Sequence, residues 1–210
     1  MLRVYTAAAA ERIVGRLSGQ IRTLSQKYRI PPESMMAVLR KEIAEIDLLD
    51  FAADALVGLN WLRYRCLHAM CKEKETPLPT RPKGLFDKLD SSTGYAQIFA
   101  FVAVNSVNYA LDRGLDTPES FGLPDGRRLK RDDPADRYRT WRRLLRDRSF
   151  NLRMGMLNLI SAAEEMNGHT DFDAYTPEEW QRAFTRYNAN VRHITPYGKE
   201  VYGYYLKYKQ

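Results

Sequence analysis

Glu42 is the residue of this sequence best placed for acid chemistry, because it lies among apolar residues. On a helical wheel of residues 35–49, Glu42 falls inside the apolar arc, whereas Lys41 and Glu45 fall outside it. A carboxyl group in apolar surroundings loses hydration, which raises its pKa and suits it to general acid catalysis near neutral pH. The structural alternative is that Glu42 pairs with an arginine or reaches water from the edge of the arc. The arc consists of Val38, Leu49, Met35, Ile46, Leu39, Ile43 and Met36.

The segment DSSTGYAQIFAF, residues 90–101, places a compact polar stretch directly before apolar residues. Ser92 or Thr93 is expected to cap the helix that follows, and Gly94 to permit a tight turn. Gln97 stands alone among the apolar residues. Because a buried amide needs hydrogen-bond partners, Gln97 is expected to contact another polar group or a ligand.

Two later segments complete a series of four. FNLRMGMLNLISAAEEM covers residues 150–166, and FTRYNANVRHITPYGKEVYGYY covers residues 184–205. With AVLRKEIAEID around Glu42 and SSTGYAQI, this order resembles the lysozyme-like superfamily, most closely its lytic transglycosylase and goose-type lysozyme branch. In that family a catalytic glutamate closes a helix and a Ser-x-Gly-x-x-Gln segment follows. An Asn-Leu-x-x-Gly helix and an Ala-Tyr-Asn motif with a Tyr-Gly tail come last.

The resemblance implies an all-α, lysozyme-like helical domain over residues 31–210, with irregular insertions and an N-terminal helical arm over residues 1–30. It implies that Glu42 is the catalytic acid and that the substrate-binding residues are Ser92, Gly94, Gln97, Tyr187 and Asn188. The third motif is matched by Asn151, Gly155 and Leu159, and the tail by Tyr197, Gly198, Val201 and Tyr204 or Tyr205. Arg186 stands where the family usually has alanine, and the gap between Glu42 and Ser92 is longer than usual.

The implied activity is cleavage of the MurNAc-GlcNAc β-1,4 bond of peptidoglycan, without a cofactor or metal. A second carboxylate often assists such a reaction. Candidates are Asp50, with its neighbour Asp47, and Asp90, each of which could equally be a solvated charge or a helix cap. In lytic transglycosylases a single glutamate suffices, because a hydroxyl of the substrate attacks and a 1,6-anhydro product forms. The sequence leaves muramidase and transglycosylase open.

The periodicity predicts helices separated by four proline- and glycine-containing breaks, with no convincing strand. The breaks lie at residues 29–34, 76–84, 116–128 and 167–179. Thr176 and Glu179 have the spacing of a capping box. The tail tyrosines are expected to pack the last helix, and Cys66 and Cys71 to be packed thiols. The predicted helices cover residues 7–28, 35–73 as one helix or two abutting ones, 96–112, 137–147, 150–166, 177–187 and a last one from about Pro196, with an irregular or β insertion near 115–135.

The formal net charge of +7 favours anionic partners. Residues 127–148 are rich in arginine and contain Tyr138 and Trp141, so a basic nucleic-acid-binding module is the alternative function. Nearby aspartates, such as Asp132 and Asp136, would instead make this a solvated, locally paired helix face. No apolar run is long enough to insert into a membrane.

The N-terminal segment MLRVYTAAAAERIVGRL has only a short apolar stretch, which Glu11 and Arg12 interrupt. A cleavable signal peptide is therefore not expected. We expect a protein made in the cytoplasm that reaches the cell wall, in the periplasm or in a target cell, by another route. It would be a phage-type lysis enzyme or an antibacterial toxin effector with an immunity protein as partner.

Overall fold

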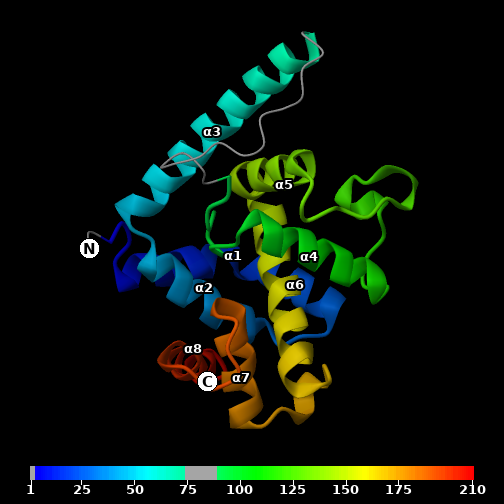
Figure 1. The fold of residues 1–210 in the computed structure, drawn as a ribbon. Helices are drawn as coiled ribbons and strands as arrows, with labels where there is room; N and C mark the ends of the chain where they lie inside the picture. Colours follow the sequence, from blue (N-terminus) through cyan, green and yellow to red (C-terminus); the bar gives the residue numbers. More distant parts are fainter. Residues whose placement is uncertain (1–2, 74–88) are drawn as a thin grey trace.

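A computed structural model describes residues 3–73 and 89–210, and over these residues the fold is all-α, as predicted (Figure 1). The described chain has no strand, only two isolated antiparallel bridges. Residues 76–84, the second predicted break, lie outside the described residues. The helices are α1 (Ala7–Tyr28), α2 (Pro32–Glu45), α3 (Leu48–Glu73), α4 (Ala100–Asp112), α5 (Pro134–Arg146), α6 (Arg148–Asn167), α7 (Pro177–Asn188) and α8 (Pro196–Tyr208).

Local signals in the sequence account for most of these boundaries. The Thr176 hydroxyl accepts from the backbone N–H of Glu179, and the Glu179 carboxylate accepts from the backbone N–H of Thr176, which confirms the capping box that starts α7. Asp133 caps α5 and Thr195 caps α8 in the same manner, with a side-chain oxygen on first-turn amides. The insertion near 115–135 is irregular, with two short 3₁₀ turns at Glu119–Phe121 and Pro124–Gly126.

The segment predicted as one long or two abutting helices is two helices, α2 and α3. They are separated at Ile46 and Asp47, where the Asp47 carboxylate accepts from the backbone N–H groups of Leu49 and Asp50 and so caps α3. The Asp50 carboxylate in turn accepts from the backbone N–H of Asp47 at 2.9 Å. As a consequence, Glu42 lies in the last turn of α2.

The start of α4 differs from the prediction. Its first helical residue is Ala100, and neither Ser92 nor Thr93 caps it. Instead, the Asp90 carboxylate accepts from the backbone N–H groups of Ala100 and Phe101 at 2.8 and 3.0 Å. Residues 91–98 therefore stay outside the helix and form a loop closed by the bridge between Thr93 and Ile98.

The core is built around α6, whose buried residues are distributed along its length and around its circumference rather than in one stripe. It runs through the middle of the molecule and packs against α4, α5, α7 and α1 (Figure 1). The N-terminal helix α1 packs on α2 and α6 through Ala10, Val14, Leu17 and Ile21. In contrast, α3 projects away from this body (Figure 1). Cys66 on α3 is exposed, so it is not the packed thiol that was expected. None of the described helices is long and apolar enough to cross a membrane.

Candidate functional site

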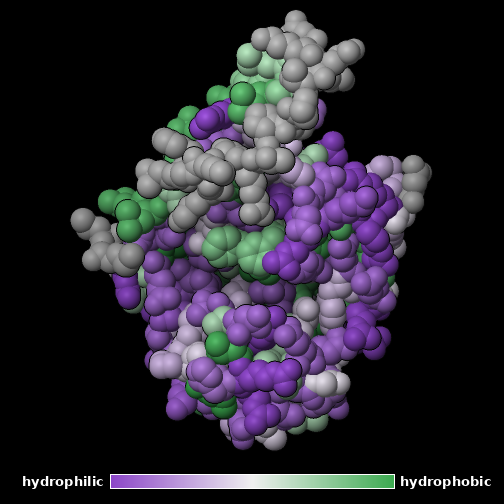
Figure 2. Space-filling view, viewed as in Figure 1, coloured by the Kyte–Doolittle hydropathy of each residue, from purple (hydrophilic) through white to green (hydrophobic). Residues whose placement is uncertain are grey.

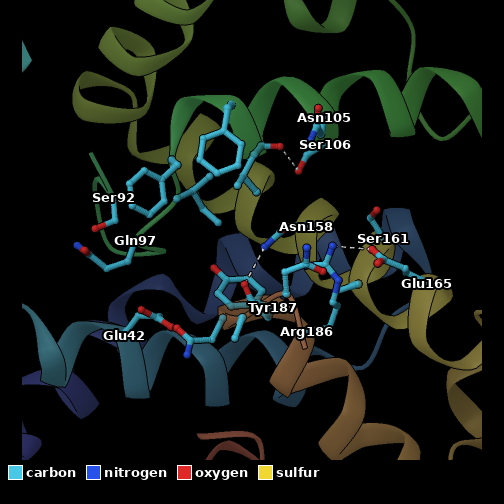
Figure 3. Close-up of a pocket in the computed structure, with 18 of the residues that line it drawn as sticks. Glu42, Ser92, Gln97, Asn105, Ser106, Asn158, Ser161, Glu165, Arg186 and Tyr187 are labelled. Carbon is cyan, nitrogen blue, oxygen red and sulfur yellow. Dashed lines mark hydrogen bonds and ion pairs between the residues drawn. The ribbon is translucent and has the colours of Figure 1, made fainter. Parts of the chain in front are cut away.

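A cavity of about 490 Å³ lies between the loop at residues 91–98 and helices α2, α4, α6 and α7. It contains Glu42 together with four of the five predicted substrate-binding residues: Ser92, Gln97, Tyr187 and Asn188. Figure 3 shows Ser92 and Gln97 on one wall, Glu42 at the same end, and Arg186 and Glu165 at the other end. The same side of the molecule is hollowed near its middle, among mostly hydrophilic residues (Figure 2). The tertiary structure thus brings together segments from widely separated parts of the chain.

Glu42 is buried, with 8% of its surface exposed. Its carboxylate accepts a hydrogen bond from the Tyr197 hydroxyl of α8. No ion pair involves Glu42 within residues 3–73 and 89–210. The neighbouring Lys41 instead pairs with Glu45 and Glu200, on the outer side of α2. The described residues thus contain no arginine partner for Glu42.

Burial raises the pKa of Glu42 from its ordinary value of 4.5 to about 7. The hydrogen bond from Tyr197 opposes this rise, because it stabilises the ionised form, and the nearby charge of Glu45 adds to it. Burial and the negative charge of Glu42 raise the pKa of the Tyr197 hydroxyl well above its usual value. Tyr197 therefore remains a hydrogen-bond donor to Glu42 at any working pH.

Asn151 of α6 holds the loop above the cavity. Its side-chain oxygen accepts from the backbone N–H of Ala96 at 3.0 Å, and its nitrogen donates to the carbonyl of Thr93 at 2.7 Å. Gly94 adopts a φ of +72° and lies against the Asn151 side chain, so a Cβ at this position would clash with it. Gly94 thus shapes the loop and does not line the cavity with the other predicted binding residues.

One turn further along α6, Gly155 allows three elements to converge. A Cβ at this position would lie 2.7 Å from the Ala96 Cβ in the loop and 2.7 Å from the Met35 side chain in α2. The Tyr187 hydroxyl, from α7, donates to the carbonyl of Ala96 at 2.7 Å. Asn151 and Gly155 are therefore needed in α6 to seat the loop beside α2, where Glu42 lies.

The other side of the loop is anchored by α3 and α5. The Asp54 carboxylate accepts hydrogen bonds from the hydroxyls of Ser91 and Thr93. The indole N–H of Trp61 donates to the carbonyl of Leu89, and that of Trp141 donates to the Ser91 hydroxyl. The polar segment in DSSTGYAQIFAF is thus held by hydrogen bonds on both sides. These contacts fix the position of the loop although the gap between Glu42 and Ser92 is long.

Gln97 has a left-handed backbone, with φ of +46°, which is uncommon for a residue other than glycine. Its side-chain nitrogen donates to the carbonyl of Gly94 at 2.8 Å. The amide thus has one of the hydrogen-bond partners that were predicted for it. The residue is half-buried and lines the cavity. Strained backbone of this kind is often retained where a side chain must point into a site.

Arg186, the departure from the family pattern, lies at the end of the cavity opposite Glu42 (Figure 3). Its guanidinium pairs with the Glu165 carboxylate at 2.8 Å. This end thus combines one cation with one carboxylate. Arg131 also lines the cavity, and its guanidinium lies over the Phe101 ring, 4.9 Å from its centroid. The remaining polar residues of the lining are Asn105, Ser106, Asn158, Ser161 and Asn190.

The two proposed second carboxylates lie outside the cavity lining. Asp90 is engaged by the first amides of α4 and lies 3.5 Å from the Arg137 guanidinium, so it acts as a helix cap. Asp50 accepts from the backbone N–H of Asp47 at the junction of α2 and α3. Apart from Glu42, the only carboxylate in the described lining is Glu165.

Sequence reasoning missed two participants of the site. Tyr197 was grouped with the tail tyrosines that pack the last helix, yet it is the hydrogen-bond partner of Glu42. Its position in the Tyr-Gly tail motif was the available signal. Nothing in the sequence predicts a role in the site for Glu165, because it has the pattern of an ordinary exposed charge on a helix. It becomes part of the cavity only because α6 packs against α7.

Part of the basic segment 127–148 is occupied by ion pairs. Arg127 pairs with Asp136 at 2.6 Å, and Arg128 with Asp112 at 2.8 Å. Trp141 is buried, so it offers no surface on which a base could stack. These contacts favour the locally paired helix face over the nucleic-acid-binding alternative.

Within the described part of the chain, no group of His, Cys, Asp and Glu side chains could hold a metal ion. Comparison of the chain with protein-family models, curated proteins and solved structures finds no match. The likeness to the lysozyme-like superfamily consequently rests on the four sequence segments alone.

Proposed function

We propose that this chain is a peptidoglycan glycosidase that cleaves the MurNAc-GlcNAc β-1,4 bond, with Glu42 as the general acid. The observation that carries this proposal is the environment of Glu42, a buried carboxyl group with a pKa raised to about 7 at one end of a polar cavity. A carboxyl group with this pKa still holds its proton in a large fraction of molecules near neutral pH. It can therefore protonate the leaving oxygen of a glycosidic bond.

The lining of the cavity suits a carbohydrate. Side-chain amides and hydroxyls can exchange hydrogen bonds with sugar hydroxyls, and the rings of Phe99 and Phe101 offer apolar surface for the C–H face of a sugar ring. Its volume of about 490 Å³ is within the range of ligand-binding cavities. The four resembling segments converge on this one cavity or on the loop beside it, which supports the same reading.

We further infer a single-acid reaction. Glu165 lies at the opposite end of the cavity and is paired with Arg186, and Asp90 accepts backbone amides of α4. Asp50 is near enough for its charge to contribute to the raised pKa of Glu42, but it does not line the cavity and its carboxylate accepts from the backbone N–H of Asp47. With no second carboxylate beside Glu42 in the described lining, attack by a hydroxyl of the substrate accounts best for the displacement. Glu42 would protonate the leaving oxygen as the glycosidic bond breaks, and its carboxylate would then take the proton of the attacking hydroxyl as the new C–O bond forms. The expected product has a 1,6-anhydro end.

Digestion of purified peptidoglycan, followed by mass spectrometry, tests both the proposed glycosidase activity and the single-acid reaction. We expect anhydro-ended muropeptides, and a loss of at least ~100-fold in rate for Glu42→Gln, which cannot donate a carboxyl proton. Glu45→Gln is the matched control, because it makes the same charge change on the outer side of the same helix. Reducing ends would refute the single-acid reaction, and intact glycan chains or a fully active Glu42→Gln variant would refute the proposed function.

A further inference from the structure

The end of the cavity opposite Glu42 carries a charge pair, formed by Arg186 of α7 and Glu165 of α6 (Figure 3). Both side chains line the cavity and remain partly open to solvent, with an exposed fraction of 54% for the side chain of Glu165 and 26% for that of Arg186. A ligand that enters the cavity can therefore reach both charges. The general-acid chemistry of Glu42 uses neither of them.

Stability alone is a poor explanation for this pair. An ion pair that is open to solvent contributes little to folding, because water screens the charges and two long side chains lose conformational freedom. In addition, the Nε of Arg186 is buried without a hydrogen-bond partner among the described residues, which disfavours the folded state. A guanidinium group has five N–H donors, so Arg186 can bind Glu165 and a second anionic group together.

The cavity as a whole has an excess of positive charge near neutral pH. Arg131 lines it and makes no ion pair within residues 3–73 and 89–210. Glu42 carries only part of a negative charge at neutral pH, because burial raises its pKa to about 7. Arg131 and Arg186 therefore outweigh Glu165 and Glu42, which favours a substrate with net negative charge.

Side-chain amides in the lining are free to bind a ligand. Asn105, Asn188 and Asn190 line the cavity, and none of them makes a side-chain hydrogen bond within the part of the chain that the structure describes. Each amide has two N–H donors and a carbonyl acceptor, so it can pair with both polar groups of a peptide unit. The lining thus suits a peptide as well as a sugar.

We propose that this end of the cavity binds the stem peptide of peptidoglycan, and that Arg186 and Glu165 recognise the free end of a diaminopimelate residue in it. That end carries a carboxylate and an ammonium group on one carbon atom. The Arg186 guanidinium would bind the carboxylate, and the Glu165 carboxylate would bind the ammonium group. This inference rests on the proposed function, because it assumes that a peptidoglycan strand lies with its scissile bond at Glu42.

The charge pair would make the protein selective for stem peptides that are not cross-linked. In a cross-link the amino group of diaminopimelate is acylated, so it has no charge and Glu165 loses its partner. A stem peptide with lysine in place of diaminopimelate has the ammonium group but lacks the carboxylate for Arg186. The other carboxylates of the stem peptide account for the excess of positive charge in the cavity.

Glycan strands from diaminopimelate-type peptidoglycan test this selectivity in three forms. The first has native, uncross-linked stem peptides, the second has its amino groups acetylated with acetic anhydride, and the third has its peptides removed by an amidase. For wild type we expect kcat/KM, measured by mass spectrometry of the new chain ends, to fall at least ~10-fold from the native to either modified form, because a charge-assisted hydrogen bond is lost. Equal values for all three forms would overturn the proposal.

Two variants test the roles of the charges. Glu165→Gln should no longer distinguish native from acetylated strands, and Arg186→Gln should lose most of the advantage of native over peptide-free strands. Arg182→Gln is the matched control, because it breaks an arginine–glutamate pair with Glu178 on the same helix but outside the lining, and it should keep the wild-type preference.

Circular dichroism verifies that each variant is folded. Because Glu165 is exposed, Glu165→Gln is informative even if Arg186→Gln does not fold. If the folded cavity variants kept the wild-type preference, the pair would be only an interhelical contact and the proposal would be wrong.

A binding measurement separates failure of this inference from failure of the proposed function. Isothermal titration calorimetry of Glu42→Gln with the same three forms of the strand requires no cleavage. If wild type cleaves none of them, binding of the native form at least ~10-fold more tightly than the modified forms would support the charge-pair site and refute only the glycosidase activity. In that case, equal or absent binding would overturn both.

Discussion

The buried carboxyl group of Glu42 should make the stability of this protein fall as the pH rises, and Glu42→Gln should abolish that component. In the folded state the pKa of Glu42 is about 7, against 4.5 for the solvent-exposed carboxyl group of an unfolded chain. Between these two values the folded protein holds a proton that the unfolded chain has released. Stability from this group is therefore fully present below about pH 4.5 and is lost progressively as the pH rises through 7.

The size of the effect follows from the shift in pKa. Each unit of pKa shift corresponds to about 1.4 kcal/mol. The rise in the pKa of Glu42 from 4.5 to about 7 therefore corresponds to roughly 3 kcal/mol of stability. Glutamine has nearly the same shape, does not ionise, and can still accept the hydrogen bond from the Tyr197 hydroxyl. The free energy of unfolding of Glu42→Gln, relative to wild type, should therefore increase by up to ~3 kcal/mol from about pH 4 to about pH 8.

Urea denaturation at a series of pH values measures this difference directly. Glu45→Gln is again the control: its side chain is exposed and ion-paired with Lys41, so its difference from wild type should stay within about 1 kcal/mol. If the profile of Glu42→Gln ran parallel to that of wild type, Glu42 would not be the buried, proton-holding group inferred here, and its role as an acid would lose its basis.

Three further outcomes are expected. Tyr197→Phe removes the hydrogen bond that favours ionised Glu42, so the alkaline limb of the pH profile for lysis of a cell-wall suspension should move to higher pH. Tyr204→Phe, which lacks a hydroxyl bound to Glu200, should leave that limb in place. Asn151→Ala leaves the buried backbone N–H of Ala96 without its partner and removes one of the two hydrogen bonds to the Thr93 carbonyl, so it should lower the free energy of unfolding by about 1–3 kcal/mol in urea titrations. Asp90→Ala should cost about 1 kcal/mol of stability through the lost cap of α4, yet preserve lysis by the folded protein; a loss of lysis would restore Asp90 as a reacting carboxylate.

Local features of the sequence were sufficient for most helices. The pattern over residues 7–28 predicted α1, and Thr176 with Glu179 predicted the start of α7, because capping depends on groups only three residues apart. The predicted start of α4 was wrong because the cap of this helix is not a close neighbour in the sequence. Its cap, Asp90, comes from ten residues upstream, and a contact of that kind requires the loop to fold back.

The unusual position of Glu42 was also visible in the sequence, since its place within an apolar arc depends only on helical periodicity. The residues that surround Glu42 in the folded protein could not be predicted from the sequence. Tyr197 lies in the last helix, and no pattern along the chain distinguishes a tyrosine that binds a carboxylate from one that packs. Glu165 likewise entered the site through the packing of α6 against α7.

By itself the sequence determined the helical class of the protein, the breaks between most helices and the place of Glu42 within an apolar arc, all of which depend on neighbours along the chain. Only the tertiary structure decided how the loop at residues 91–98 meets Glu42 across the long insertion. Anchors on α3, α5, α6 and α7 hold that loop, through side chains such as Asp54, Trp141, Asn151 and Tyr187. Such contacts join residues far apart in the chain, and their geometry exists only once the helices have packed.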